Sequence, residues 1–175
     1  MTATQPDPRR RRVVLALGSN LGERLDTLQG AVDALFDAPG MDFVAVSPVY
    51  ETEPVGGPPQ PDYLNAILIA ETVLSARTVL ERAQGAEVAF HRTRETAWGP
   101  RTLDVDIITI GDETRDDADL VLPHPRAHER AFVLAPWHDI DPGAEIPGRG
   151  RVADLLAKTG TDGVRRYGAT LHPPV

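Results

Sequence analysis

The sequence predicts an α+β fold with a ferredoxin-like βαββαβ core, in which a mainly antiparallel sheet carries helices on one face. Three observations lead to this prediction. Short apolar stretches typical of strands alternate with longer stretches whose apolar residues recur at helical spacing. They follow one another in the order strand, helix, strand, strand, helix, strand. The chain of 175 residues is long enough for one domain with a substantial core.

The first strand is predicted over Val13–Leu17, an apolar run that ends at Gly18-Ser19-Asn20. Asn20 is a favoured N-cap residue, so a helix is expected to follow it directly. Five residues form the apolar side of this helix: Leu21, Leu25, Leu28, Val32 and Leu35. Pro39-Gly40 is expected to end the helix. The turn at Gly18 lacks the lysine of a Walker loop, so we interpret it as a turn that shapes the floor of a pocket.

Two strands and a second helix are predicted next. The strands are expected over Phe43–Tyr50, which is rich in valine, and Tyr63–Thr72. Residues 51–61 between them hold two glycines and four prolines and are long for a hairpin connection. Such a segment predicts a functional loop without regular structure. The second helix is expected over Ser75–Glu87, with Ser75 as its N-cap.

The fourth strand of the core is predicted over Asp104–Ile110, after a polar loop at residues 90–97. Further helices are expected over His128–Trp137 and Val152–Lys158, and a short terminal strand over Val164–Tyr167. Residues 1–12 contain two prolines and a run of four arginines, and we expect them to be a disordered tail. Residues 13–175 are then expected to form a single domain.

Composition limits the classes of function. The net charge of −8 argues against nonspecific nucleic-acid binding. The chain has no cysteine, which excludes disulfides and thiol nucleophiles. No apolar run is long enough to span a membrane or to serve as the core of a signal peptide. We therefore expect a cytoplasmic protein whose partners are neither nucleic acids nor membranes.

Two carboxylates, Asp104 and Asp106, lie at the start of the fourth core strand. Because side chains alternate along a strand, both are expected to point to one face, and Val105 and Ile107 to the other. Neighbouring carboxylates repel each other, and a Mg²⁺ ion that also binds substrate phosphates would compensate this repulsion. The alternative is a solvated strand face that carries two aspartates by chance. The guanidinium of Arg101, three residues earlier, suits phosphate oxygens and favours the metal site.

Basic residues cluster in the middle of this acidic chain. They are Arg92, Arg94, Arg101, His124, Arg126, His128 and Arg130. Such a cluster favours a small polyanion, for instance a nucleoside triphosphate. The alternative is a set of surface ion pairs, each of which contributes little. Together, the carboxylates and the cations predict a Mg²⁺-dependent transfer of a phosphate-containing group.

Four motifs occur in an order that is typical of one family. They are Gly-Ser-Asn-Leu-Gly at 18–22, Tyr-Leu-Asn-Ala at 63–66, the segment 98–108, and Pro-His-Pro-Arg at 123–126. In these motifs the chain resembles the 6-hydroxymethyl-7,8-dihydropterin pyrophosphokinase family over about residues 13–158. The resemblance implies that the β,γ-pyrophosphate of ATP moves to the hydroxymethyl group of 6-hydroxymethyl-7,8-dihydropterin in folate biosynthesis and that AMP is released. It also implies the same α/β core with long flexible substrate loops.

The resemblance further implies how the nucleotide is bound. Asp104 and Asp106 would hold two Mg²⁺ ions. Arg92 and Arg94 would act on the phosphates as catalytic residues, and His124 would contact phosphate near the α position. Positive charge around the nucleotide would come from Arg101 and Arg130. Other residues near the nucleotide, or between the two ligands, would be Leu80, Gln84, Glu87, Trp98 and Ile107.

For the pterin, the resemblance implies a sandwich between two aromatic rings, Tyr63 and Phe132. Asn65 would read the amide edge of the pterin with its side-chain amide. Three residues of the long loop would lie at the remaining edge: Thr52, Pro54 and Val55. Trp98 would pack where the loops close.

Two other classes of function stay open. A ferredoxin-like ligand-binding module without catalysis would explain the fold and the acidic surface. A Mg²⁺-dependent nucleotidyltransferase would use the same pair of aspartates, but it would release pyrophosphate instead of AMP. The expected partners are the small molecules ATP and 6-hydroxymethyl-7,8-dihydropterin, and we expect a monomer.

Overall fold

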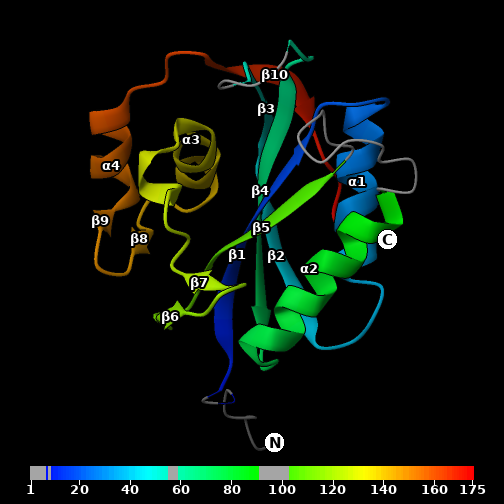
Figure 1. Ribbon diagram of the computed structural model, residues 1–175, viewed down its shortest axis with the longest axis vertical. Helices are drawn as coiled ribbons and strands as arrows, with labels where there is room; N and C mark the ends of the chain where they lie inside the picture. The colour runs from blue at the N-terminus through cyan, green and yellow to red at the C-terminus, as the bar shows by residue number, and fades with distance from the viewer. Residues whose placement is uncertain (1–6, 8, 55–58, 91–102) are drawn as a thin grey trace, which may run out of the picture.

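A computed structural model describes residue 7 and residues 9–54, 59–90 and 103–175. A central antiparallel sheet stands between two layers of helices (Figure 1). Its strands lie in the order β10-β3-β4-β1-β5, and β2 pairs with β4 as well. Figure 1 shows α1 and α2 on one side of the sheet and α3 and α4 on the other.

The first seven elements form the predicted ferredoxin-like core. They are β1 (Arg11–Ser19), α1 (Arg24–Leu35), β2 (Met41–Val46), β3 (Pro48–Thr52), β4 (Tyr63–Thr72), α2 (Ala76–Phe90) and β5 (Asp104–Ile110). The predicted second strand is divided at Ser47 into β2 and β3, which both pair with β4. Ser47 still bonds to the sheet, because its backbone amide donates to the Ile67 carbonyl at 2.9 Å and its Oγ accepts a hydrogen bond of 2.8 Å from the Ile67 amide.

The remaining elements follow the core. They are β6 (Arg115–Asp116), β7 (Val121–Leu122), the 3₁₀ helix η1 (Ala127–Glu129), α3 (Ala131–Ile140), β8 (Glu145–Ile146), β9 (Gly150–Arg151), α4 (Val152–Thr159) and β10 (Val164–Thr170). The prediction that helices lie on one face of the sheet holds for α1 and α2 of the core. Helices α3 and α4 cover the opposite face. The second face needs this cover because it presents the apolar side chains of Ile67, Ile69 and Ile108.

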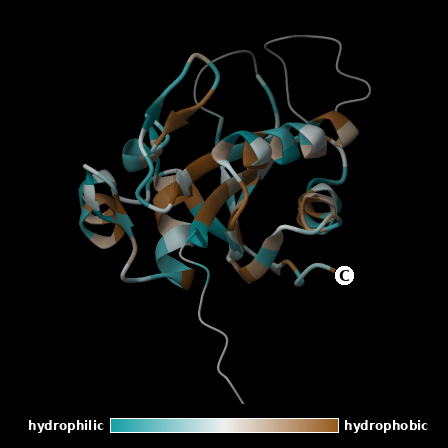
Figure 2. Cartoon of the chain, turned by 90° about the horizontal axis from the view of Figure 1, so that it is seen from below, coloured by the Kyte–Doolittle hydropathy of each residue, from teal (hydrophilic) through white to brown (hydrophobic). Residues whose placement is uncertain are grey.

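Two hydrophobic cores therefore flank the sheet. Leu15 and Leu17 of β1 point into the first core, with apolar residues of α1 and α2. Val14, on the other side of the same strand, packs in the second core with α3 and α4. Hydrophobic residues are concentrated on the middle layer in Figure 2. Within the described residues no helix is both long and apolar enough to cross a membrane.

Several boundaries differ from those predicted. β1 begins at Arg11, so two residues assigned to the tail belong to the sheet. The expectation that α1 follows Asn20 directly is wrong, since the helix begins at Arg24. Asn20 is buried and donates hydrogen bonds to Gln60 Oε1 (2.9 Å) and the Pro61 carbonyl (3.1 Å), so its side chain holds the long loop instead of capping a helix.

The predicted cap of the second helix is confirmed. Ser75 precedes α2, and its Oγ accepts a hydrogen bond of 3.2 Å from the Thr78 amide. The third helix begins later than predicted, since residues 127–129 form η1 before α3 starts at Ala131.

The C-terminal strand β10 lies at the edge of the sheet beside β3. A polar cluster joins it to α3 as well. The Tyr50 hydroxyl donates a hydrogen bond of 2.5 Å to Asp139, and the Arg166 guanidinium binds the same carboxylate at 3.0 Å. Burial, followed by the hydrogen bond to Asp139, raises the pKa of Tyr50 to about 12, so the hydroxyl keeps its proton at neutral pH. This cluster holds β3, α3 and β10 together.

The central position of β1 gives a prediction for stability. Leu15 is fully buried and lies opposite Leu68 of β4 and Ile107 of β5. We expect Leu15→Ala to lower the free energy of unfolding by about 2–5 kcal/mol, because it removes buried methyl groups and leaves a cavity. Urea denaturation monitored by circular dichroism measures this change. Val44→Ala in β2 is the control, since Val44 is 39% exposed; equal midpoints for the two variants would contradict the prediction.

Candidate active site

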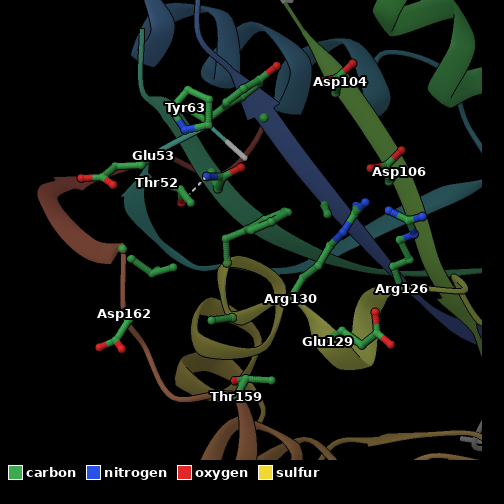
Figure 3. Close-up of a pocket in the computed structure, with 18 of the residues that line it drawn as sticks. Thr52, Glu53, Tyr63, Asp104, Asp106, Arg126, Glu129, Arg130, Thr159 and Asp162 are labelled. Carbon is green, nitrogen blue, oxygen red and sulfur yellow. Dashed lines mark hydrogen bonds between the residues drawn. The ribbon is translucent and has the colours of Figure 1, made fainter. Parts of the chain in front are cut away.

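A cavity of about 790 Å³ opens on the α3 side of the sheet (Figure 3). Strands β1, β4 and β5 form its base, and η1 and the start of α3 form one wall. The end of β3 and the turn between α4 and β10 form the opposite wall. Eight predicted site residues line it: Thr52, Pro54, Tyr63, Asn65, Asp104, Asp106, Arg130 and Phe132. The fold thus brings predicted pterin, phosphate and metal residues into one space.

The register of β1 explains why these residues meet. Gly18 pairs with Asn65 of β4 on one side and with Asp104 of β5 on the other. Ala16 pairs with Asp106 in the same register. Directly opposed residues of antiparallel strands share a face, so all of these positions face the cavity. With neighbouring strands about 4.8 Å apart, Asn65 and Asp104 are separated by two spacings, or about 10 Å.

Because Gly18 has no side chain, the side chains of Asn65 and Tyr63 can lie close to the backbone of β1. A Cβ atom at position 18 would lie 3.2 Å from Asn65 Oδ1 and 3.7 Å from Tyr63 Cδ1. The first of these contacts is tighter than ordinary van der Waals packing, so a larger residue would press the amide of Asn65 away by a few tenths of an ångström. The prediction that the segment at Gly18 shapes a pocket floor fits this geometry, although Gly18 lies inside β1 and not in a turn.

Asp104 and Asp106 are half-buried and point from β5 toward the cavity, as predicted from strand alternation (Figure 3). Val105 and Ile107 point into the first core. Within the described residues no third His, Cys, Asp or Glu joins the pair in a group that could hold a metal ion. Two carboxylates that leave other ligand positions to phosphates and water fit Mg²⁺, which is usually held this way in phosphate-transfer sites.

The predicted pterin side of the cavity has a fixed hydrogen bond. The Asn65 side-chain amide is buried and donates to Thr52 Oγ1 at 2.7 Å. This bond orients the amide between β3 and β4. Tyr63 and Phe132 both line the cavity, and the Arg130 guanidinium lies 5.5 Å from the centre of the Phe132 ring. Such a cation–π contact places Arg130 between the aromatic and the carboxylate regions.

His124 lies beside this site but does not line the cavity. Its amide donates to the Ile108 carbonyl at 2.9 Å, and its Nδ1 accepts a hydrogen bond of 3.1 Å from the Arg126 amide. Because Nδ1 is an acceptor, the neutral imidazole carries its proton on Nε2. Burial lowers the pKa of His124, the charge of Asp106 opposes this shift, and Arg130 and Arg126 add to it. In this environment His124 offers an Nε2–H donor without a formal charge.

Four residues predicted near the nucleotide do not line this cavity. Leu80 and Ile107 pack in the first core, on the other side of the sheet. Gln84 is exposed on α2, and Glu87 accepts a hydrogen bond of 2.9 Å from the Val105 amide. Their roles near the nucleotide or between the two ligands stay predictions. Five further predicted residues lie outside the described residues: Val55, Arg92, Arg94, Trp98 and Arg101.

Other residues of the cavity were given no individual ligand role from the sequence, although Arg126 was counted in the basic cluster expected to favour a small polyanion. They are Ala16, Leu17, Gly18, Glu53, Arg126, Glu129, Ala131, Thr159, Gly160, Asp162, Gly163 and Val164. Arg126 belongs to the Pro-His-Pro-Arg motif, so a signal for it was present. The turn at 159–164 gave no local signal, because only the pairing of β10 with β3 brings it to the cavity.

Comparisons with known proteins show the family of this chain. Residues 14–142 match the family model described as 7,8-dihydro-6-hydroxymethylpterin-pyrophosphokinase (HPPK). The 2-amino-4-hydroxy-6-hydroxymethyldihydropteridine pyrophosphokinase of Mycobacterium leprae is 48% identical, in an alignment that covers 91% of each chain. The protein of the same name from Mycobacterium tuberculosis is 46% identical over 145 residues, which cover 77% of this chain and 75% of that protein.

Solved structures share the fold. An HPPK-DHPS protein in complex with substrates superposes with a TM-score of 0.66 at 11% identity. A variant of Plasmodium falciparum HPPK-DHPS with SDX-DHP gives a TM-score of 0.68 at 13% identity. The superposed parts cover 85% and 90% of the present chain. They cover only 43% and 49% of the two HPPK-DHPS chains. The family model covers most of the chain and the curated relatives are similar over most of their length, so the chain belongs to the 7,8-dihydro-6-hydroxymethylpterin-pyrophosphokinase family.

Proposed function

We propose that this chain transfers the pyrophosphoryl group of ATP to the hydroxymethyl group of 6-hydroxymethyl-7,8-dihydropterin, a reaction of folate biosynthesis. The hydroxymethyl oxygen forms a bond to the β-phosphorus, and the bond from the β-phosphorus to the oxygen that bridges it to the α-phosphorus breaks. AMP leaves with the bridging oxygen, and the hydroxyl proton passes to solvent. The observation that carries the proposal is the register of β1, which places Asn65 and Asp104 on either side of Gly18 in one cavity.

The pterin would occupy the end of the cavity formed by β3, β4 and α3. Tyr63 and Phe132 supply flat rings for stacking, which stabilises a bicyclic ligand beyond the burial of area alone. Asn65 supplies a buried amide whose orientation Thr52 fixes. A site built to hydrogen-bond its ligand discriminates strongly against ligands that lack the matching groups. Val55 and Trp98 remain predicted contacts at this end.

The triphosphate would lie at the other end, beside β5. Asp104 and Asp106 would hold Mg²⁺, and the proposal includes two ions. When bound, the cation neutralises charge on the phosphates and favours ionisation of the attacking hydroxyl. Arg130 and the Nε2–H of His124 would donate to phosphate oxygens. Arg92, Arg94 and Arg101 are proposed as further phosphate ligands on the strength of the resemblance.

Positioning and electrostatics account for catalysis in this proposal. The chain has no cysteine, so a thiol nucleophile is excluded. Direct attack of the hydroxymethyl group requires only that its oxygen lie in line with the leaving AMP. A monomer as the functional unit stays a prediction. A cytoplasmic location stays a prediction.

The leaving group separates this proposal from a nucleotidyltransferase. A pyrophosphokinase releases AMP and leaves two phosphates on the pterin, whereas a nucleotidyltransferase releases pyrophosphate. The purified chain should form AMP from ATP and 6-hydroxymethyl-7,8-dihydropterin in the presence of Mg²⁺. Separation of the nucleotide products by chromatography decides between the two reactions. Binding of both ligands without turnover would support the module without catalysis instead.

Removal of either carboxylate tests the metal assignment. We expect Asp104→Asn and Asp106→Asn each to reduce kcat by at least about a thousandfold, because electrostatic stabilisation of the transferred group is lost. Initial rates of AMP formation at saturating Mg²⁺ measure the effect. Asp112→Asn is the matched control, since Asp112 is exposed in the turn after β5 and does not line the cavity. Rates near that of the control in either variant would rule out the assignment.

The close packing of Asn65 against Gly18 gives a prediction for the KM of the pterin substrate. Gly18→Ala should raise the KM for the pterin about tenfold, since the new Cβ would press on Asn65 Oδ1 and a displaced hydrogen bond costs about 1–2 kcal/mol. Gly143→Ala is the control, because a Cβ there meets no atom within 4 Å. Steady-state kinetics with each substrate varied in turn would show whether the KM for ATP stays nearly constant. An equal rise in both KM values would point to general disruption instead.

A further inference from the structure

Arg126 lines the cavity, although the resemblance gives it no role. It stands at the start of η1, four residues before Arg130. Arg126 and Arg130 flank η1 at its two ends, and Figure 3 shows both guanidinium groups extending from this segment toward β5 beside Asp106. Two of the cationic side chains of the cavity therefore come from the two ends of η1.

The guanidinium of Arg126 forms no ion pair with another residue in the described part of the chain. Most described arginines outside the cavity bind carboxylates, as Arg77 does with Asp119 and Arg115 with Glu113. Neither Arg126 nor Arg130 forms an ion pair with any described carboxylate, even though Glu129 lies between them in sequence. The contact of Glu129 is with His128 Nε2, at 3.5 Å.

The position of Arg126 points to one part of the triphosphate. The cavity that Arg126 lines also holds Tyr63, Asn65 and Phe132 of the proposed pterin end. In contrast, four residues predicted near the nucleotide or between the two ligands lie on α2 or in the first core, and His124, predicted near the α-phosphate, does not line the cavity. The group that must lie between the pterin and the leaving AMP is the pyrophosphoryl group in transfer.

We propose that Arg126 binds the β,γ-pyrophosphoryl group of ATP together with Arg130, an inference that rests on the proposed function. Arg126 donates from its guanidinium to the phosphate oxygens, while its backbone amide orients His124 through Nδ1. The same contacts persist after transfer, when the two phosphates are attached to the pterin. An exposed arginine paired with one carboxylate contributes little, but a guanidinium that meets a multiply charged phosphate group forms stronger hydrogen bonds.

Binding measurements test this assignment without turnover. Isothermal titration calorimetry compares Arg126→Ala with the wild-type chain for α,β-methylene-ATP with Mg²⁺ and for AMP. We expect the affinity for the ATP analogue to fall about tenfold, as the loss of a hydrogen bond to a charged group implies. The affinity for AMP should change less than about twofold, since AMP lacks the two phosphates. Arg126→Lys should recover part of the loss, because the charge remains.

The control is Arg151→Ala. Arg151 is an exposed arginine in β9 that does not line the cavity, so its removal changes the net charge equally. Unchanged affinity for the analogue in Arg126→Ala would overturn the inference, as would an equal loss for AMP and the analogue. A loss as large in Arg151→Ala would also overturn it, by showing a general effect of charge. Failure of the wild-type chain to form AMP would count against the proposed function, whereas these binding data decide the role of Arg126.

Discussion

The register of β1 against its two neighbours is the constraint on which the site depends. A shift of one residue would turn the side chains of β1 to the opposite faces of the sheet. Leu15 and Leu17 would then leave the first core, at a cost of about 1.5–3 kcal/mol for each side chain. The same shift would place Leu17 opposite Asn65, where Gly18 now leaves room. Burial of two leucines on one face therefore fixes the geometry of the cavity on the other.

The two faces of β1 have opposite requirements, and the sequence meets both by alternation. Large residues fill the core beneath α1, whereas Ala16 and Gly18 on the cavity side leave space above the sheet. A cavity open enough for two ligands needs walls that do not collapse into it. The cluster of Tyr50, Asp139 and Arg166 supplies such support, because it ties the strand before the long loop to α3 and to the edge strand β10.

Local sequence patterns were sufficient for the core elements and for the common face of Asp104 and Asp106. The period of a strand determines which residues share a face, so this inference needs no tertiary information. Asn20 was misread because an asparagine before a helical pattern resembles a cap, yet its buried amide binds the long loop at Gln60. The turn at 159–164 could not be predicted, since its place in the cavity depends on the long-range pairing of β10 with β3.

An entering ligand does not have to break an ion pair among Asp106, Arg126 and Arg130, three described residues of the cavity. Among the described residues, Asp106 forms no ion pair with Arg126 or Arg130, although all three line one cavity. Had they been paired, each would have required a new partner when a cation and phosphates entered, and the lost pair would have reduced the net gain. The separation of Asp106 from the two guanidinium groups instead complements a ligand that is itself made of separate charges, a cation and a polyphosphate. On a chain with a net charge of −8, the cations of this cavity offset the repulsion of the anionic nucleotide that the proposed function requires.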